Sequence, residues 1–369
     1  MRIDNKIKDN RRIKKIYDFY AKDLDLREID RFFREDAKKA YEYYLKEYPD
    51  NKKAGNSFSH LIHRVWDFFI AFLSKFTPFR RILYTLAIVI FLLGFFDYNQ
   101  QQILVAFLLL NLLIMLELAD KLTAKEELNI ARNIQIEIMS KNVPHDENYE
   151  IAAYSEAANE VGGDYYEFFK CEHSEINSFF ILGDISGKGM SAALTMIQIQ
   201  AALKTILMDD KSPKQILIEL NVKLNRLLKR DEFITAIFGC IKKNGDVVLC
   251  RAGHTPIIYY SMKDMQCGRI KPSGIGIGPV FSKHFDSYIC EKTVAPEQGD
   301  ILVFYTDGVT EMENGSKIQF GEENLLSIVS RNAGKSPAEI METIKLALMQ
   351  FRNYGSSSDD SSLIIMKRI

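Results

Sequence analysis

The sequence has few of the residues that soft-metal and redox sites require. Its 369 residues include six scattered histidines and five cysteines, none of which forms a C-x-x-C pair. Structural zinc sites and thioredoxin-like motifs use such pairs, so buried, reduced thiols in the cytosol explain the cysteines best. His60 and His63 could share a helix face, but a solvated or interfacial pair explains them better than a zinc site.

The sequence also lacks the motifs of several other hydrolases and of nucleotide-binding loops. No cysteine is followed by the x₅-Arg of a cysteine phosphatase, and neither Asp-x-Asp-x-Thr nor Gly-x-Ser-x-Gly occurs. Two Gly-Lys pairs, at Gly187 and Gly334, resemble phosphate loops but fail the motif. Gly183 is too close to the first pair, and Val329 stands where the second needs glycine.

Charge is nearly balanced, at a net −1, but it is unevenly distributed. Residues 1–81 contain 20 Lys or Arg and 13 Asp or Glu, whereas the remainder contains 28 and 36. A positive N-terminal part is consistent with contact to anionic membrane lipid, and nucleic acid, the weaker alternative, is not expected as a partner. Solvated charged helices explain any single charge run equally well.

Two apolar runs predict a membrane hairpin. Residues 82–96 and 103–118 are apolar and are separated by a polar turn at 97–102. With their flanking residues they reach about 18 residues each, enough for a thin bilayer; a buried hairpin of a soluble domain is the alternative. Lys and Arg lie outside the two runs and not in the turn, so both flanks are expected in the cytoplasm. We therefore predict a two-span protein of the inner or plasma membrane, with its N-terminus and catalytic domain cytoplasmic.

The chain is expected to have four parts. Residues 1–79 are a helical region that is interfacial or sensory, 80–119 the transmembrane hairpin, 120–144 a connector helix, and 145–369 a catalytic domain. Strands are predicted in that domain at 149–157, 163–170, 177–184, 233–242, 246–252, 256–261, 284–292, 300–306 and 361–368, and helices at 189–208, 213–230, 321–331 and 336–351. This order predicts an α+β fold of packed antiparallel sheets with helices outside them.

Acidic residues stand at strand ends or in glycine turns throughout this domain. Asp164 follows Gly162-Gly163, Asp184 ends an apolar run, Asp307 follows another, and Asp359-Asp360 precedes the last one. Converging carboxylates suit hard ions such as Mg²⁺ or Mn²⁺. Two such ions about 4 Å apart can clamp a phosphoryl group and activate a water molecule. An aspartate that only caps a turn is the alternative for each residue alone, but four together favour phosphatase chemistry.

The same segments carry a family resemblance. Residues 131–369 resemble the PPM (PP2C-like) metal-dependent serine/threonine phosphatases, in the bacterial branch typified by SpoIIE and RsbU. The resemblance rests on 131–135, 160–166, 183–189, 252–256, 305–311 and 359–362, in the family's order. It implies the family's αββα sandwich, here preceded by the helical region and the hairpin.

By position, the resemblance implies specific ligands for two or more Mn²⁺ or Mg²⁺ ions. Asp164, Asp184 and Asp307 would be catalytic metal ligands, with the Ile185 carbonyl assisting. Asp359 would complete the site, with Asp360 as its register alternative. The family commonly has Met-Thr where this chain has Ser361-Ser362, and its phosphate-binding arginine has no evident counterpart. Lys188 is expected to face solvent, and His254 is expected to be structural.

These inferences predict a membrane-anchored protein serine/threonine phosphatase. The resemblance implies a phosphorylated protein substrate, a STAS-type anti-sigma-factor antagonist in partner-switching signalling, and a homodimer. It also suggests that the connector helix passes a signal to the helices at 189–208 and 213–230. Two alternatives remain: a catalytically silent membrane module that binds a partner, and an enzyme acting on small phosphoesters or nucleotides.

Overall fold

The computed structural model describes residue 66 and residues 69–139, 143–158, 161–171, 175–187, 189–279, 284–353 and 359–369. The chain divides into two compact units, Met1–Lys121 and Leu122–Ile369. The predictions for residues 1–65 and for Lys188 lie outside the described residues.

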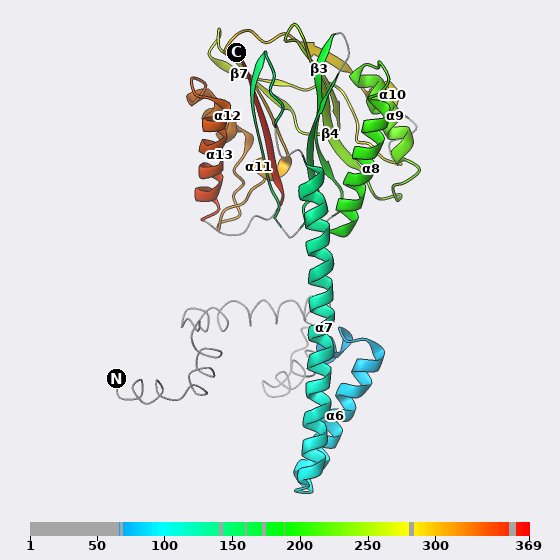
Figure 1. Ribbon diagram of the computed structural model, residues 1–369. Helices are drawn as coiled ribbons and strands as arrows, with labels where there is room; N and C mark the ends of the chain where they lie inside the picture. The colour runs from blue at the N-terminus through cyan, green and yellow to red at the C-terminus, as the bar shows by residue number, and fades with distance from the viewer. Residues whose placement is uncertain are drawn as a thin grey trace, which may run out of the picture. The chain divides into compact units, whose positions relative to one another are not determined.

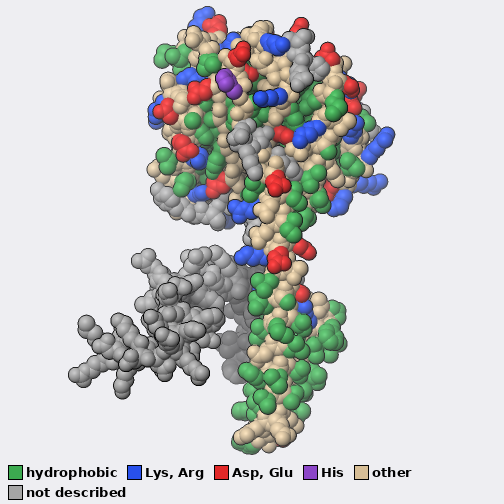
Figure 2. Space-filling view, viewed as in Figure 1, with side chains coloured by type: hydrophobic (Ala, Val, Ile, Leu, Met, Phe, Trp, Pro, Cys, Tyr) green, Lys and Arg blue, Asp and Glu red, His purple; other side chains and the backbone are tan. Residues whose placement is uncertain are grey.

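The described part of the first unit consists mainly of two apolar helices. Helix α6 (Pro78–Phe96) starts with proline in its first turn, where the missing N–H costs nothing. Helix α7 (Gln100–Ile138) follows Asn99, whose side chain accepts the Gln101 N–H at 3.1 Å, and it continues into the second unit. Both helices are long and apolar enough to cross a membrane. Hydrophobic side chains cover α6 and the adjacent part of α7 (Figure 2).

Ion pairs join the start of α6 to the later part of α7. Arg80 Nη1 lies 3.2 Å from Glu117 Oε2 and 2.7 Å from Asp120 Oδ2. These contacts bring the two polar flanks of the apolar runs to one end of an antiparallel helix pair. The expected hairpin geometry is therefore present.

The second unit contains two five-stranded antiparallel sheets (Figure 1). Sheet A has the order β1-β10-β9-β6-β7 and sheet B the order β2-β3-β4-β5-β8. The strands of sheet A are Tyr149–Glu156, Ser361–Arg368, Ile301–Tyr305, Ile257–Ser261 and Gln266–Ile270; those of sheet B are Asp164–Lys170, Ile176–Ile185, Ile234–Lys242, Val247–Ala252 and Glu291–Val294.

Helices cover the outer face of each sheet. Helices α8 (Met190–Ile206) and α9 (Pro213–Leu224) lie on sheet B, and α12 (Glu322–Arg331) and α13 (Pro337–Phe351) lie on sheet A. A third apolar layer, containing Phe180 and Phe304 with ring centroids 5.1 Å apart, fills the space between the sheets. The predicted αββα sandwich is confirmed.

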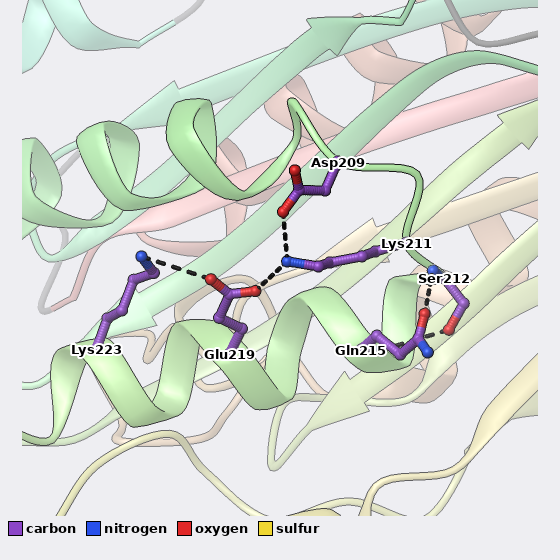
Figure 3. A network of polar contacts seen from close by, with 6 residues as sticks. All are labelled: Asp209, Lys211, Ser212, Gln215, Glu219 and Lys223. Carbon is purple, nitrogen blue, oxygen red and sulfur yellow. Dashed lines mark hydrogen bonds and ion pairs between the residues drawn. The ribbon is translucent and has the colours of Figure 1, made fainter.

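A polar network fixes the connection between α8 and α9 (Figure 3). Lys211 Nζ lies 2.7 Å from Asp209 and 2.5 Å from Glu219, while Ser212 and Gln215 form a reciprocal capping box at the start of α9. Such a box satisfies two N–H groups that the first turn leaves without helical partners. The helix pair predicted at 189–208 and 213–230 therefore has a defined turn, although α9 ends earlier than predicted, at Leu224.

Two predictions of secondary structure were wrong. The strand expected at 284–292 is a short helix, α10 (Phe285–Tyr288), followed by β8, because Phe285 and Ile289 are both buried four residues apart. Strand β7 was missed because its edge position leaves most of its residues exposed, so it lacks an alternating apolar pattern.

Candidate metal centre

The paired strands β2 and β3 bring two candidate ligands face to face. Asp164 begins β2, Asp184 lies one residue before the end of β3, and the antiparallel register places them directly opposite each other. Like charges in this arrangement repel. Asp164 is only 2% exposed, and burial raises its pKa well above the usual value. Hydrogen bonds from Thr306 and Ser362 oppose that shift in pKa, and Asp184 and Asp360 reinforce it. A cation would offset both the repulsion between the two carboxylates and the cost of burying Asp164.

Glycine at position 163 lets the chain pass close to these carboxylates. A Cβ at Gly163 would lie 2.6 Å from the Ile185 carbonyl oxygen and 3.1 Å from Asp184 Oδ1. The Ile185 N–H donates to the Gly163 carbonyl at 3.1 Å and so holds the two segments together. A carboxylate oxygen and a carbonyl oxygen thus lie near the same glycine, and hard divalent ions bind such oxygens.

The turn after β3 also depends on glycine. Gly187 and Gly189 have φ values of 101° and 74°, in the left-handed region that other residues rarely adopt. Next to them, the Ser186 hydroxyl accepts the Phe233 N–H at 2.7 Å, and the Ser186 N–H donates to the Phe233 carbonyl at 2.9 Å. The turn that carries Asp184 and Ile185 is thus pinned to the start of β4.

Asp307 and the Asp359-Asp360 pair lie at one end of sheet A, where β9 ends and β10 begins. Below, 'edge' means this end of the sheet and not an outer strand. Asp307 is the first residue of the short helix α11 (Asp307–Thr310), directly after β9. A Cβ at Gly308 would lie 1.9 Å from the Asp360 carbonyl oxygen, so only glycine allows these two segments to pack so closely. Thr306, the residue before Asp307, donates a hydrogen bond of 2.7 Å from its hydroxyl to Asp164 Oδ2. The sheet A edge therefore adjoins the Asp164–Asp184 pair.

The two neighbouring aspartates differ in their partners. Asp360 is buried, and its Oδ1 and Oδ2 accept the N–H groups of Ala158 at 2.7 Å and Gly163 at 2.5 Å. Asp359 is half-buried and accepts the Asp360 N–H at 3.0 Å. Asp360 therefore holds the glycine turn in place.

The carboxylates come together in pairs and do not form a closed cage. Among the described residues, no group of three or more His, Cys, Asp or Glu side chains is arranged to hold a metal ion. Mg²⁺ typically uses one or two carboxylates and keeps several water ligands. The donors present, carboxylates and a backbone carbonyl beside a glycine, fit an ion of that kind.

Gln135, near the end of α7, also contacts this site and was not among the predicted residues. Its buried amide donates to the carbonyl oxygens of Gly162 and Asp164, both at 3.3 Å, and accepts the Gly162 N–H at 3.2 Å. Ala131, one turn earlier, packs with Val161 and Ala193. The sequence shows only a polar residue four positions after a small apolar one, and this spacing does not reveal the partner of Gln135.

His254 is linked to the Asp184 strand pair through Thr235. Its Nδ1 is 2.8 Å from the Thr235 hydroxyl, and Thr235 is opposite Asp184 in the β3–β4 register. Burial lowers the pKa of His254 to about 3, so the ring is neutral near pH 7. Arg251 donates to its carbonyl oxygen. These contacts are those of a structural residue.

Comparisons with known proteins agree with this fold. The family model described as Stage II sporulation protein E (SpoIIE) matches residues 175–369. The chain is 31% identical over 250 residues to the phosphoserine phosphatase RsbU of Bacillus subtilis, a match that covers 66% of this chain and 70% of RsbU.

Solved structures share the fold. The SiaA-PP2C domain of Pseudomonas aeruginosa matches with a TM-score of 0.57 and 17% identity, covering 68% of this chain and 98% of that domain. The PP2C phosphatase domain of SpoIIE from Bacillus subtilis, with a fragment of its regulatory domain, matches with a TM-score of 0.51 and 17% identity, covering 62% of this chain and 69% of that one. The predicted family is confirmed, and this chain belongs to the SpoIIE family of PP2C-type phosphatases.

Proposed function

We propose that this protein hydrolyses phosphoserine or phosphothreonine in a protein substrate, using divalent ions held at the Asp164–Asp184 edge. It is a protein serine/threonine phosphatase by family and by its similarity to a phosphoserine phosphatase. The observation that carries the metal assignment is the Asp164–Asp184 pair, with the Ile185 carbonyl oxygen and Asp184 Oδ1 both close to Gly163.

Four aspartates and one carbonyl are the proposed ligands. Asp164 and Asp184 approach from sheet B with the Ile185 carbonyl, while Asp307 and Asp359 approach from the edge of sheet A. We assign Asp359 rather than Asp360, because both Asp360 oxygens already accept backbone N–H groups. When bound, two or more Mg²⁺ or Mn²⁺ ions supply Lewis acidity that activates water and neutralises phosphoryl charge.

The protein's own residues have three tasks in this proposal. The aspartates orient the ions, and the glycines at 162, 163 and 308 let their segments approach one another. Asp360 and Gln135 hold the turn before Asp164 from two sides, through its N–H and carbonyl groups. Movement of the end of α7 would then shift this turn and α8 together, which supports the connector helix as the route of regulation.

Membrane attachment through α6 and α7 is the second part of the proposal. Arg80 and Arg81 precede the first apolar run, Lys121 and Lys125 follow the second, and the intervening turn has neither residue type. The positive-inside rule then places both flanks in the cytoplasm. The proposed parts remain an N-terminal region at 1–79, a hairpin at 80–119, a connector at 120–144 and a phosphatase domain at 145–369.

The proposed partners follow from the family. The substrate would be a phosphorylated STAS-type antagonist of an anti-sigma factor, in partner-switching signalling, and the protein would act as a homodimer in contact with lipid. The similarity to RsbU supports this class of signalling. A silent binding module would have no use for the opposed carboxylates of Asp164 and Asp184.

Phosphate release by the full chain in detergent tests the function. Wild type and Asp184→Asn are assayed on a phosphoserine-containing STAS-domain protein and on p-nitrophenyl phosphate, with Mn²⁺ or with EDTA. We expect Mn²⁺-dependent release that favours the phosphoprotein and is lost in the variant. Release unaffected by EDTA and by the substitution would contradict the assignment, and preference for the small ester would favour the small-phosphoester alternative.

A further inference from the structure

Thr306 links the two sheets at the end where Asp164, Asp184, Asp307 and Asp359 lie, which we call the metal edge. It is fully buried and lies between the end of β9 and the start of α11, at the N-cap position of that helix. A threonine at this position normally accepts an N–H of the first helical turn with its side-chain oxygen, which stabilises the helix. Here the side chain makes no such bond. Its hydroxyl is used elsewhere.

The direction of the Thr306 hydroxyl is fixed by its neighbours. The Ser362 N–H donates to Thr306 Oγ1 at 2.9 Å, and the Thr306 N–H donates to the Ser362 carbonyl at 3.1 Å. A hydroxyl has a single proton. Because Ser362 already donates to the oxygen, that proton points to Asp164 Oδ2, 2.7 Å away.

We propose that Thr306 is a positioning residue for the metal ligand Asp164: its hydroxyl holds one carboxylate oxygen so that the other is presented to the ion. The inference rests on the proposed function, because it assumes that Asp164 binds a divalent cation. It adds a residue that touches neither the ion nor the substrate.

The surroundings of Asp164 explain why such a donor matters. The carboxylate is buried, and it faces Asp184 across the strand pair. A buried carboxylate is costly to ionise unless hydrogen bonds support its charged form. The Thr306 hydroxyl donates to one oxygen of this carboxylate at 2.7 Å. Loss of the hydroxyl would weaken ion binding by leaving the carboxylate less ordered.

A purely structural role makes a different prediction. If Thr306 only ties β9 to β10 through Ser362, its loss would lower stability and leave the affinity for metal unchanged. Residues that hydrogen-bond to a metal ligand typically contribute ten- to a hundredfold to metal affinity or activity. Metal affinity measured directly therefore separates the two roles.

The test compares two matched pairs in the full chain in detergent. Wild type and Thr306→Val differ by hydroxyl against methyl, and Thr306→Ser and Thr306→Ala differ by one oxygen. Mn²⁺ binding is measured from the electron paramagnetic resonance signal of free Mn²⁺. Phosphate release is measured against Mn²⁺ concentration, with Asp184→Asn as the control that lacks a ligand. Circular dichroism in EDTA checks that each variant is folded.

We expect Thr306→Val and Thr306→Ala to bind Mn²⁺ about tenfold or more weakly than their hydroxyl-bearing partners. The release rate at saturating Mn²⁺ should fall much less than the affinity. Equal affinity within both pairs would overturn the proposal, as would equal weakening in Thr306→Ser and Thr306→Val. If Thr306→Val does not fold, the Ser and Ala variants decide. Wild type that binds no Mn²⁺ would instead refute the proposed function.

Discussion

Asp300 and Asp164 of the sandwich are equally buried, but different groups surround their carboxylates. Asp300 precedes β9, and its carboxylate accepts the Tyr259 hydroxyl and the N–H groups of Met262 and Glu297, the latter two at 2.8 Å. Asp164 begins β2, accepts the Thr306 hydroxyl at 2.7 Å, and faces the carboxylate of Asp184. Each is 2% exposed.

The difference distinguishes a structural carboxylate from a proposed metal ligand. Hydrogen bonds from the protein compensate Asp300 for the loss of water, so its charge is supported by the fold itself. Asp164 faces another acid where Asp300 has N–H donors, and we propose that a cation supplies the compensation. A buried acid opposed by a second acid is the feature on which the proposed metal site rests.

The largest effect is expected from the two neighbouring aspartates of the metal edge. Asp359→Asn should lower phosphate release at least about a thousandfold, because metal ions supply several kcal/mol of transition-state stabilisation. Asp360→Asn should retain Mn²⁺-dependent release but lower the unfolding temperature, because one of two N–H groups loses its acceptor. Activity assays and thermal denaturation of both variants check this, and the reverse pattern would make Asp360 the ligand.

The next prediction separates the two buried acids by stability. In EDTA, Asp300→Asn should lower the free energy of unfolding by about 3 kcal/mol, because hydrogen bonds to a charged group are lost. Asp164→Asn should change it by less than about 1 kcal/mol, since the loss of a bond is offset by relief of repulsion with Asp184. Denaturant titration measures both values. A larger loss in Asp164→Asn would remove the distinction.

A smaller effect is expected from a methyl group at the metal edge. Gly163→Ala places a Cβ against the Ile185 carbonyl and Asp184 Oδ1, and should weaken Mn²⁺ binding about tenfold to a hundredfold. Gly268→Ala in β7 is the matched control, because the nearest atom to a Cβ there would be the Tyr259 carbonyl oxygen, 3.9 Å away. Mn²⁺ dependence of phosphate release measures both. Equal dependence in the two variants would show that the close approach at Gly163 is not part of the site.

The smallest effect concerns His254, a buried base at the same edge. Its pKa is lowered to about 3 by burial, so below pH 6.5 the unfolded chain binds a proton that the folded chain does not. The free energy of unfolding should therefore decrease as the pH is lowered, and this group alone should account for about 1 kcal/mol between pH 6.5 and 5.5. Denaturation in EDTA should show a steeper fall for wild type than for His254→Asn. Equal slopes would contradict a neutral, buried ring.

Much of the catalytic domain could be predicted because its strands and helices have clear apolar patterns. The candidate ligands could be predicted because each follows or precedes the apolar run of a strand. Edge strand β7 and helix α10 could not be predicted well, because exposure and burial there depend on neighbours distant in sequence. Asp359 and Asp360 were indistinguishable in sequence, and only the N–H donors around Asp360 separate them. Gln135 and Thr306 were missed for the same reason, since their partners lie 27 and 142 residues away.

Direct Mn²⁺ binding tests the central claim, that the acid pair at Asp164 and Asp184 is a metal site. Isothermal titration of the full chain in detergent with Mn²⁺ compares wild type, Asp184→Asn and Asp300→Asn. The account predicts two or more ions bound by wild type and by Asp300→Asn, with binding greatly weakened in Asp184→Asn. Wild-type binding that survives Asp184→Asn unchanged, or is absent altogether, would contradict it.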